Sequence, residues 1–125
     1  MNLYQEEILE HYHEPHNNGR LANPTHQRCA NNPTCGDKIC TTIIVSGNKI
    51  KDINFEGEGC AISQASASMV TDKIKGKGVE YALTLTKDDI IEMLGIEIGI
   101  GRIRCALLGI ETIQKALEFG KIKNQ

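Results

Sequence analysis

The stretch KICTTIIVSGNKIKDINF, residues 38–55, decides the fold. Its two halves, 38–46 and 49–55, are rich in β-branched side chains at alternating positions, and this pattern predicts two strands. Between the halves lies the dipeptide Gly47-Asn48, which suits the positive φ angles of a two-residue hairpin turn. A β-hairpin is therefore expected in the first half of the chain.

Segments in which apolar residues have helical spacing precede and follow this hairpin in the sequence. Thr86 and Asp89 have the spacing of a capping box at the start of one helix. Helices are expected over residues 3–13, 61–75, 80–85, 88–94 and 103–119, and a third strand near residues 26–30. This order predicts an α+β fold, in which the helices pack on one side of a small antiparallel three-stranded sheet. Since domains of about 100–150 residues are the commonest, residues 1–125 are expected to form a single domain.

Composition excludes several classes of protein. The chain has 14 Lys and Arg against 16 Asp and Glu, with a net charge of -2, so it lacks the basic profile of a nucleic-acid binder. No apolar run approaches the roughly 20 residues of a membrane helix, and no membrane partner is expected. The first residues lack the basic and apolar pattern of a secretory signal. A cytoplasmic protein is therefore expected.

Five cysteines in this chain need an explanation. An odd number cannot all pair within one chain, and a reducing cytoplasm disfavours structural disulfides. The cysteines are then buried small hydrophobes, metal ligands or nucleophiles. Burial as a free cysteine fits Cys40 best, because it lies within an alternating strand, whereas Cys29 is ambiguous. Neither is assigned to the site, and a structural role is favoured for both.

The other three cysteines lie at turns or helix starts. Cys35 is on a tight turn beside Asp37, and Cys60 and Cys105 stand at the first turns of expected helices, where the helix dipole stabilises a thiolate. Three thiolates and one carboxylate could complete a tetrahedral metal site. Such a site would be assembled by the fold, because the spacings are not those of a zinc finger. The alternative is that these cysteines are also buried hydrophobes.

Three segments around these cysteines resemble the motifs of a known family. They are NNPTCGD (31–37), FEGEGCAISQASASMVT (55–71) and RIRCALLGIETIQKAL (102–117), and the opening LYQEEILEHYHEPHNNGRL (3–21) is similar as well. Together they resemble the IscU/SufU/NifU-N family of iron–sulfur cluster assembly proteins over nearly the whole chain. The resemblance implies a compact α+β protein with an exposed site formed by Cys35, Asp37, Cys60 and Cys105.

The resemblance also implies a function. Family members accept persulfide sulfur from a cysteine desulfurase of the SufS or IscS kind, then build a transient [2Fe–2S] cluster from iron or pass the sulfur onward to acceptor proteins. Many bind zinc in the resting form. The implied role is a scaffold or sulfur relay more than an enzyme. Cys35, on the more mobile turn, is the expected sulfur acceptor, and Cys105 is the competing one. A zinc-dependent enzyme and a metal-free interaction domain are the other classes considered.

The chain combines features of two branches of this family, the IscU type and the SufU type. Arg104 stands where IscU-type members carry a His before the third cysteine, and residues 98–102, IGIGR, replace their Leu-Pro-Pro-Val-Lys chaperone-docking segment. Both differences disfavour an Hsp70-type chaperone as a partner. SufU-type members typically carry an insertion between the second and third cysteines, which this chain lacks. The chain therefore has SufU-like motifs at IscU-like length. Arg104 either neutralises thiolate charge or is a solvated first-turn residue.

Histidines and Tyr4 lie outside the cysteine motifs. On a helix, positions i and i+2 do not face each other, so the His-x-His pair of the first helix does not predict a metal site. His11, His13, His16 and His26 are all predicted to be surface residues. Tyr4 either helps two scaffolds to pair or anchors its helix.

Overall fold

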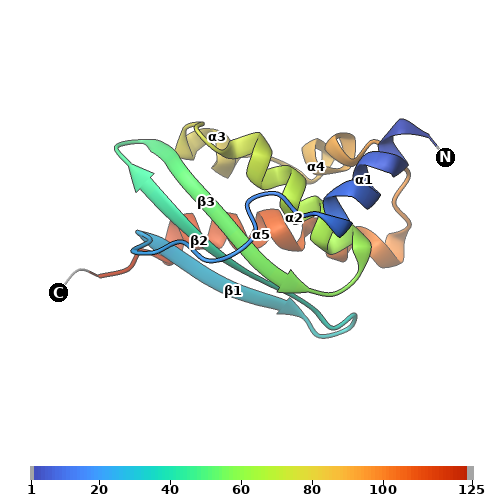
Figure 1. The fold of residues 1–125 in the computed structure, drawn as a ribbon, viewed down its shortest axis with the longest axis horizontal. Coiled ribbons are helices and arrows are strands. Elements are labelled where there is room, and N and C mark those ends of the chain that lie inside the picture. The colour runs from blue at the N-terminus through green and yellow to red at the C-terminus, as the bar shows by residue number, and fades with distance from the viewer. Residues whose placement is uncertain (1, 124–125) are drawn as a thin grey trace.

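A three-stranded antiparallel sheet is the centre of the computed structural model, which describes residues 2–123. Its strands are β1 (His26–Asn32), β2 (Asp37–Ser46) and β3 (Lys49–Glu58), in the order β1-β2-β3 (Figure 1). The β2–β3 hairpin turns at Gly47, whose φ is 62°. The predicted hairpin is confirmed, and the third strand extends past the expected residues 26–30 to Asn32.

Among residues 2–123, five α-helices pack on one side of this sheet (Figure 1). They are α1 (Leu3–His13), α2 (Ala61–Ile74), α3 (Val79–Thr84), α4 (Lys87–Leu94) and α5 (Ile103–Phe119), with a 3₁₀ turn at Ile100–Arg102 just before α5. The predicted α+β class is confirmed. The capping box of α4 is also present, since Thr86 and Asp89 each bond the other's backbone N–H. No helix among the described residues is long and apolar enough to cross a membrane.

Aliphatic side chains fill the space between the sheet and the helices. Ile43, Ile50 and Ile53 of the sheet are fully buried, and they pack in one cluster with apolar residues of α2, α4 and α5. A smaller cluster around Phe55 continues this layer toward the β1–β2 end of the sheet. At about 25 cal/mol for each Å² of apolar surface removed from water, such burial is the main stabilising contribution.

Helices α2 and α5 cross at very short range. A Cβ placed on Gly109 would lie 2.9 Å from the Cα of Ala67, so only glycine fits at this crossing. Near the same point the Ser66 hydroxyl donates to the carbonyl of Ala106 at 2.7 Å. Because the crossing lies within two turns of the start of each helix, it brings the first turns of α2 and α5 to the same end of the sheet.

Tyr4 fixes the N-terminal helix to the end of α4. Its ring covers Gly95, the left-handed C-cap of α4 (φ 69°), and a Cβ at Gly95 would overlap the ring. Half of the Tyr4 surface is still exposed. This contact is the one expected of a helix anchor.

Two cysteines predicted to be free are bonded to each other. Cys29 and Cys40 face each other in the register of β1 and β2 and form a disulfide, with Cα atoms 4.0 Å apart. Cys40 is only partly buried, because the alternation of β2 places Ile39 in the core and Cys40 on the opposite face. The prediction of a buried free Cys40 is therefore wrong. The odd count excluded complete pairing, but it could not exclude one pair.

Candidate metal and sulfur site

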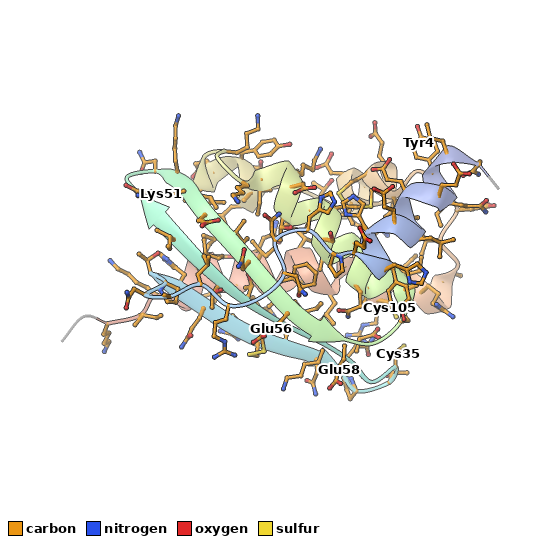
Figure 2. The ribbon with its side chains drawn as sticks, viewed as in Figure 1. Tyr4, Cys35, Lys51, Glu56, Glu58 and Cys105 are labelled. Carbon is orange, nitrogen blue, oxygen red and sulfur yellow. A yellow bond between two sulfur atoms is a disulfide. The ribbon has the colours of Figure 1, made fainter. Side chains whose placement is uncertain are left out.

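Three of the four predicted site residues converge at the end of the sheet. Ligand atoms of Cys35, Asp37 and Cys105 all lie within 4.8 Å of one another. The Cys105 thiol donates to the sulfur of Cys35 at 3.4 Å, and Figure 2 shows these two residues together where β1 passes into β2. They come from a turn, a strand start and a helix start, so the fold assembles the cluster, as the spacings predicted.

The turn that presents Cys35 is built by Asn32. Its carbonyl accepts the backbone N–H groups of Cys35 at 3.2 Å and Gly36 at 2.8 Å, and its side-chain oxygen accepts the N–H of Thr34. Gly36 has a φ of 74°, which a side chain would disfavour. The turn closes tightly and leaves Cys35 exposed at its tip.

Asp37 is deeper than its place in a turn motif suggests. It is the first residue of β2 and is fully buried. Its Oδ1 accepts the backbone N–H of Cys60 at 2.8 Å, and its Oδ2 lies 3.8 Å from the Cys60 sulfur. Gly59 allows this approach: its φ is 139°, and a Cβ there would lie 2.8 Å from the Cα of Asp37. Cys60 thus joins the cluster through Asp37.

Cys105 has the opposite environment to Cys35. It lies in the first turn of α5 and is fully buried. Burial, followed by hydrogen bonds with Asp37 and Cys35, raises the pKa of the Cys105 thiol far above its ordinary value. The amide of Asn32 lies 3.9 Å from its sulfur. The exposed site implied by the family resemblance is thus exposed at Cys35 but closed over Cys105.

Sequence reasoning missed two residues that shape this cluster. Asn32 is buried and contacts both the Cys35 turn and the Cys105 sulfur, and the Asn32-Pro33 dipeptide marked only a turn. Gly59 marked only a glycine-broken stretch ahead of the helix expected over residues 61–75. The informative feature was its place next to Cys60, where close backbone approach to a ligand favours glycine.

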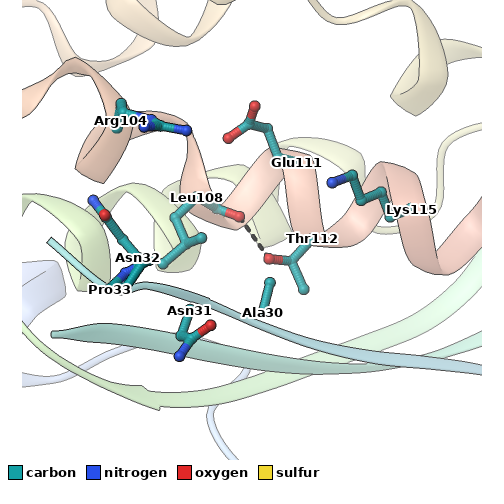
Figure 3. A pocket seen from close by; sticks show the side chains of 9 residues that line it. All are labelled: Ala30, Asn31, Asn32, Pro33, Arg104, Leu108, Glu111, Thr112 and Lys115. Carbon is teal, nitrogen blue, oxygen red and sulfur yellow. Dashed lines mark hydrogen bonds between the residues drawn. The ribbon is translucent and has the colours of Figure 1, made fainter.

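Arg104 faces a hollow beside the cluster. The hollow has a volume of about 180 Å³, and Figure 3 shows Arg104, Glu111 and Lys115 of α5 along one wall. Asn31 and Asn32 of β1 line the other wall. Arg104 is exposed, as a solvated first-turn residue would be.

One histidine prediction is wrong. His11 is 7% exposed, and its Nδ1 lies 2.7 Å from the hydroxyl of Ser68 on α2. Burial, and next the neighbouring His16, lowers the pKa of His11. His11 is three residues after the buried Ile8 and shares its face of α1. This face packs on the serine-rich surface of α2, where a polar side chain can be satisfied.

Comparison with known proteins now places the chain in a family. The family described as "NifU-like N terminal domain" matches residues 3–125. The chain belongs to this family. It is 42% identical to the zinc-dependent sulfurtransferase SufU of Bacillus subtilis, with 92% of this chain and 89% of the relative aligned. It is 38% identical to the iron–sulfur cluster assembly scaffold protein IscU of Aquifex aeolicus, over 92% of this chain and 74% of the relative.

Solved structures of NifU-like proteins share the fold. One is a putative iron–sulfur cluster assembly scaffold protein for the SUF system from Fervidobacterium islandicum. It superposes with a TM-score of 0.75 at 27% identity, covering 90% of this chain and 94% of that one. The alignment with SufU runs over 132 residues although this chain has only 125, so that relative carries residues that this chain lacks. This difference is consistent with the interpretation that the chain has SufU-like motifs but is shorter than SufU-type members.

Proposed function

We propose that this protein is a scaffold and sulfur acceptor in iron–sulfur cluster assembly. It takes persulfide sulfur from a SufS- or IscS-like cysteine desulfurase and holds zinc or a transient [2Fe–2S] cluster, which it delivers to acceptor proteins. The site consists of Cys35, Asp37, Cys60 and Cys105. The observation that carries the proposal is the convergence of Cys35, Asp37 and Cys105 within 4.8 Å, with Cys60 bound to the same carboxylate. The names of the SufU and IscU relatives support it.

The donor set fits zinc. Three cysteine sulfurs and one carboxylate oxygen supply four ligands of the kinds that tetrahedral zinc takes. Bound zinc would hold the sulfurs as thiolates, including that of Cys105, which burial otherwise keeps protonated. Asp37 is the hard donor among soft ones and is expected to be the weakest ligand. The cluster itself is cargo, formed from delivered sulfur and iron.

The exposure of Cys35 supports its role as the sulfur acceptor. Its thiolate attacks the outer sulfur of the desulfurase persulfide, so a new S–S bond forms on Cys35. The bond between that sulfur and the desulfurase cysteine breaks, and its electron pair leaves on the desulfurase thiolate. No net oxidation occurs, and the Cys35 proton goes to solvent. Cys105 is fully buried and cannot meet a partner's persulfide without movement of the turn.

Transfer of radiolabelled sulfur tests this assignment. With desulfurase and labelled cysteine, Cys35→Ser is expected to lose the label that the unaltered protein acquires. The Cys29→Ser/Cys40→Ser double variant is the matched control and should keep it, because these cysteines lie outside the site. Full labelling of Cys35→Ser, with loss in Cys105→Ser, would transfer the role to Cys105.

A second candidate is a zinc-dependent sulfur relay of the SufU type that builds no cluster. Arg104 before the third cysteine and the 42% identity to SufU favour it. Anaerobic reconstitution with desulfurase, cysteine and ferrous iron separates the two. Visible absorption of a [2Fe–2S] centre supports the scaffold. Faster desulfurase turnover with the zinc-loaded protein and no such absorption supports the relay.

A further inference from the structure

A second cluster of ligand-type side chains lies between α1 and α2. His11 of α1, His16 of the following loop and Asp72 of α2 offer ligand atoms within 4.8 Å of one another. Asp72 follows Cys60 by twelve residues, which is about 18 Å along a helix axis. The cluster is therefore separate from the cysteine site, and the proposed function does not use it.

The three side chains already meet at one point. His16 Nδ1 lies 2.5 Å from Asp72 Oδ2, and the rings of His11 and His16 have centroids 4.3 Å apart. Two imidazoles and one carboxylate form a ligand set that zinc and other divalent first-row metals accept. No thiol belongs to this set, so its spectroscopic properties would differ from those of the cysteine site.

Neighbouring groups hold these side chains in place. The Ser68 hydroxyl bonds His11 Nδ1 at 2.7 Å and accepts the backbone N–H of His16 at 2.8 Å. Asn17 donates to the other oxygen of Asp72 at 2.9 Å. Metal-ligating histidines commonly donate their second ring N–H to such a partner. In the tautomer in which His11 Nδ1 donates to Ser68, Nε2 keeps the lone pair that a metal needs.

The cluster is open to solvent. The side chains of His16 and Asp72 are 46% and 45% exposed. A hollow of about 260 Å³ adjoins His11 and Asp72, and its lining consists of Glu7, His11, Met69, Asp72, Lys73 and Met93. Glu7 precedes His11 by one helical turn and adds negative charge, whereas Lys73 opposes it. An ion can reach the site without any opening of the core.

We propose that His11, His16 and Asp72 form a second binding site, for a divalent first-row transition-metal ion. The ion takes the place of the hydrogen bond between His16 Nδ1 and Asp72 Oδ2. A neutral His16 then carries its proton on Nε2, so that Nδ1 offers its lone pair to the ion. Because the ligands come from α1, its following loop and α2, the bound ion cross-links the N-terminal segment to α2. The alternative is that the same residues form only a hydrogen-bonded contact.

Cobalt titration of the zinc-loaded full chain tests the proposal. Co²⁺ at this site is expected to give ligand-field absorption without the sulfur-to-cobalt charge-transfer band that thiolates produce. His16→Asn should weaken this binding by about tenfold or more, and Asp72→Asn likewise. His13→Asn is the matched control, since His13 lies exposed on α1 outside the cluster, and it should leave binding unchanged.

The cobalt titration distinguishes failure of this second site from failure of the proposed function at the cysteines. If the cysteine site failed to hold zinc, cobalt would bind its thiolates and give the sulfur-to-cobalt charge-transfer band. This band would appear whether or not cobalt also binds the histidines. Absence of a saturable, charge-transfer-free signal would overturn the second site. Equal weakening by His16→Asn and His13→Asn would overturn it too. Circular dichroism of each variant confirms that the fold is retained.

Discussion

The cysteine cluster and the histidine cluster are two ligand-rich regions built in different ways. The cysteine cluster takes its residues from a turn, a strand start and helix starts at one end of the sheet. The histidine cluster lies between the sides of two packed helices and a loop. Each gathers residues distant in the chain. The first depends on two glycines with positive φ angles, Gly36 and Gly59, whereas the positive φ beside the second is that of Asn17, at 54°.

This difference shows how each cluster gains its order. In the cysteine cluster a buried carboxylate is fixed by a backbone N–H, and the absence of a side chain at Gly59 makes room for it. In the histidine cluster the order comes from side-chain hydrogen bonds to Ser68 and Asn17. A side chain added at Gly59 should therefore damage the first cluster selectively, whereas protonation should act on the second.

The largest effect is expected from Gly59→Ala. A methyl group there would clash with Asp37, and the φ of 139° disfavours any side chain. Strain and overpacking together should lower the free energy of unfolding by about 3 kcal/mol. Zinc affinity at the cysteines should fall, while cobalt binding at His11, His16 and Asp72 persists. Urea unfolding and metal titration measure the two effects.

Gly101→Ala is the matched control, because a Cβ at Gly101 meets no atom within 4 Å. It should change neither stability nor zinc binding by a comparable amount. If Gly59→Ala matched this control, the close approach of Asp37 to Cys60 would not be the feature that orders the cysteine cluster.

The sequence predicted the fold because its main determinants are local. Alternation over residues 38–55, the hairpin glycine and the helical spacing each act within a few residues. The same holds for the Cys35 turn, whose proline and glycine mark a bend. The burial of Asp37 was not predictable in this way, since it depends on Gly59, 22 positions away, passing over the carboxylate.

The histidine cluster was missed for a similar reason. The rule that i and i+2 do not face each other on a helix is correct for His11 and His13, but it says nothing about His16 in the loop. The partner of His16 is Asp72, 56 residues further on. Only the packing of α1 on α2 brings them together.

The disulfide offers a second test, with an effect of similar size but away from both clusters. Removing a cross-link that spans 11 residues should lower the free energy of unfolding by about 3 kcal/mol in the chain-entropy account. The Cys29→Ser/Cys40→Ser double variant should show this loss in urea unfolding, yet keep zinc and cobalt binding. Chemically reduced wild-type protein is the control and should match the variant.

Counting thiols checks the bond itself. Metal-free protein denatured without reductant should expose three thiols to alkylation, those of Cys35, Cys60 and Cys105. Five reactive thiols under these conditions would show that β1 and β2 carry a free pair, and the predicted stability loss would then have no basis.

The smallest expected effect is a dependence of the free energy of unfolding on pH. It distinguishes the two clusters, because it arises from protonation of His11 in the histidine cluster. Burial lowers the pKa of His11 below 6.5, with His16 as the next cause and Asp72, Glu7 and Glu10 opposing it. Between that lowered pKa and 6.5 the unfolded chain binds more protons at residue 11 than the folded chain does. The free energy of unfolding of metal-free protein should therefore fall as the pH drops below about 6.5.

His11→Asn should flatten this decline, because an amide can still bond Ser68 but does not titrate. His13→Asn, at an exposed position on the same helix, should leave the slope unchanged. His26 is a second contributor, since burial and then Lys121 lower its pKa, so some slope remains in His11→Asn. Urea unfolding at a series of pH values measures all three proteins. An equal slope in His11→Asn and the unaltered chain would mean that His11 is protonated alike in both states, and that the histidine cluster is no more sensitive to pH than the cysteine cluster.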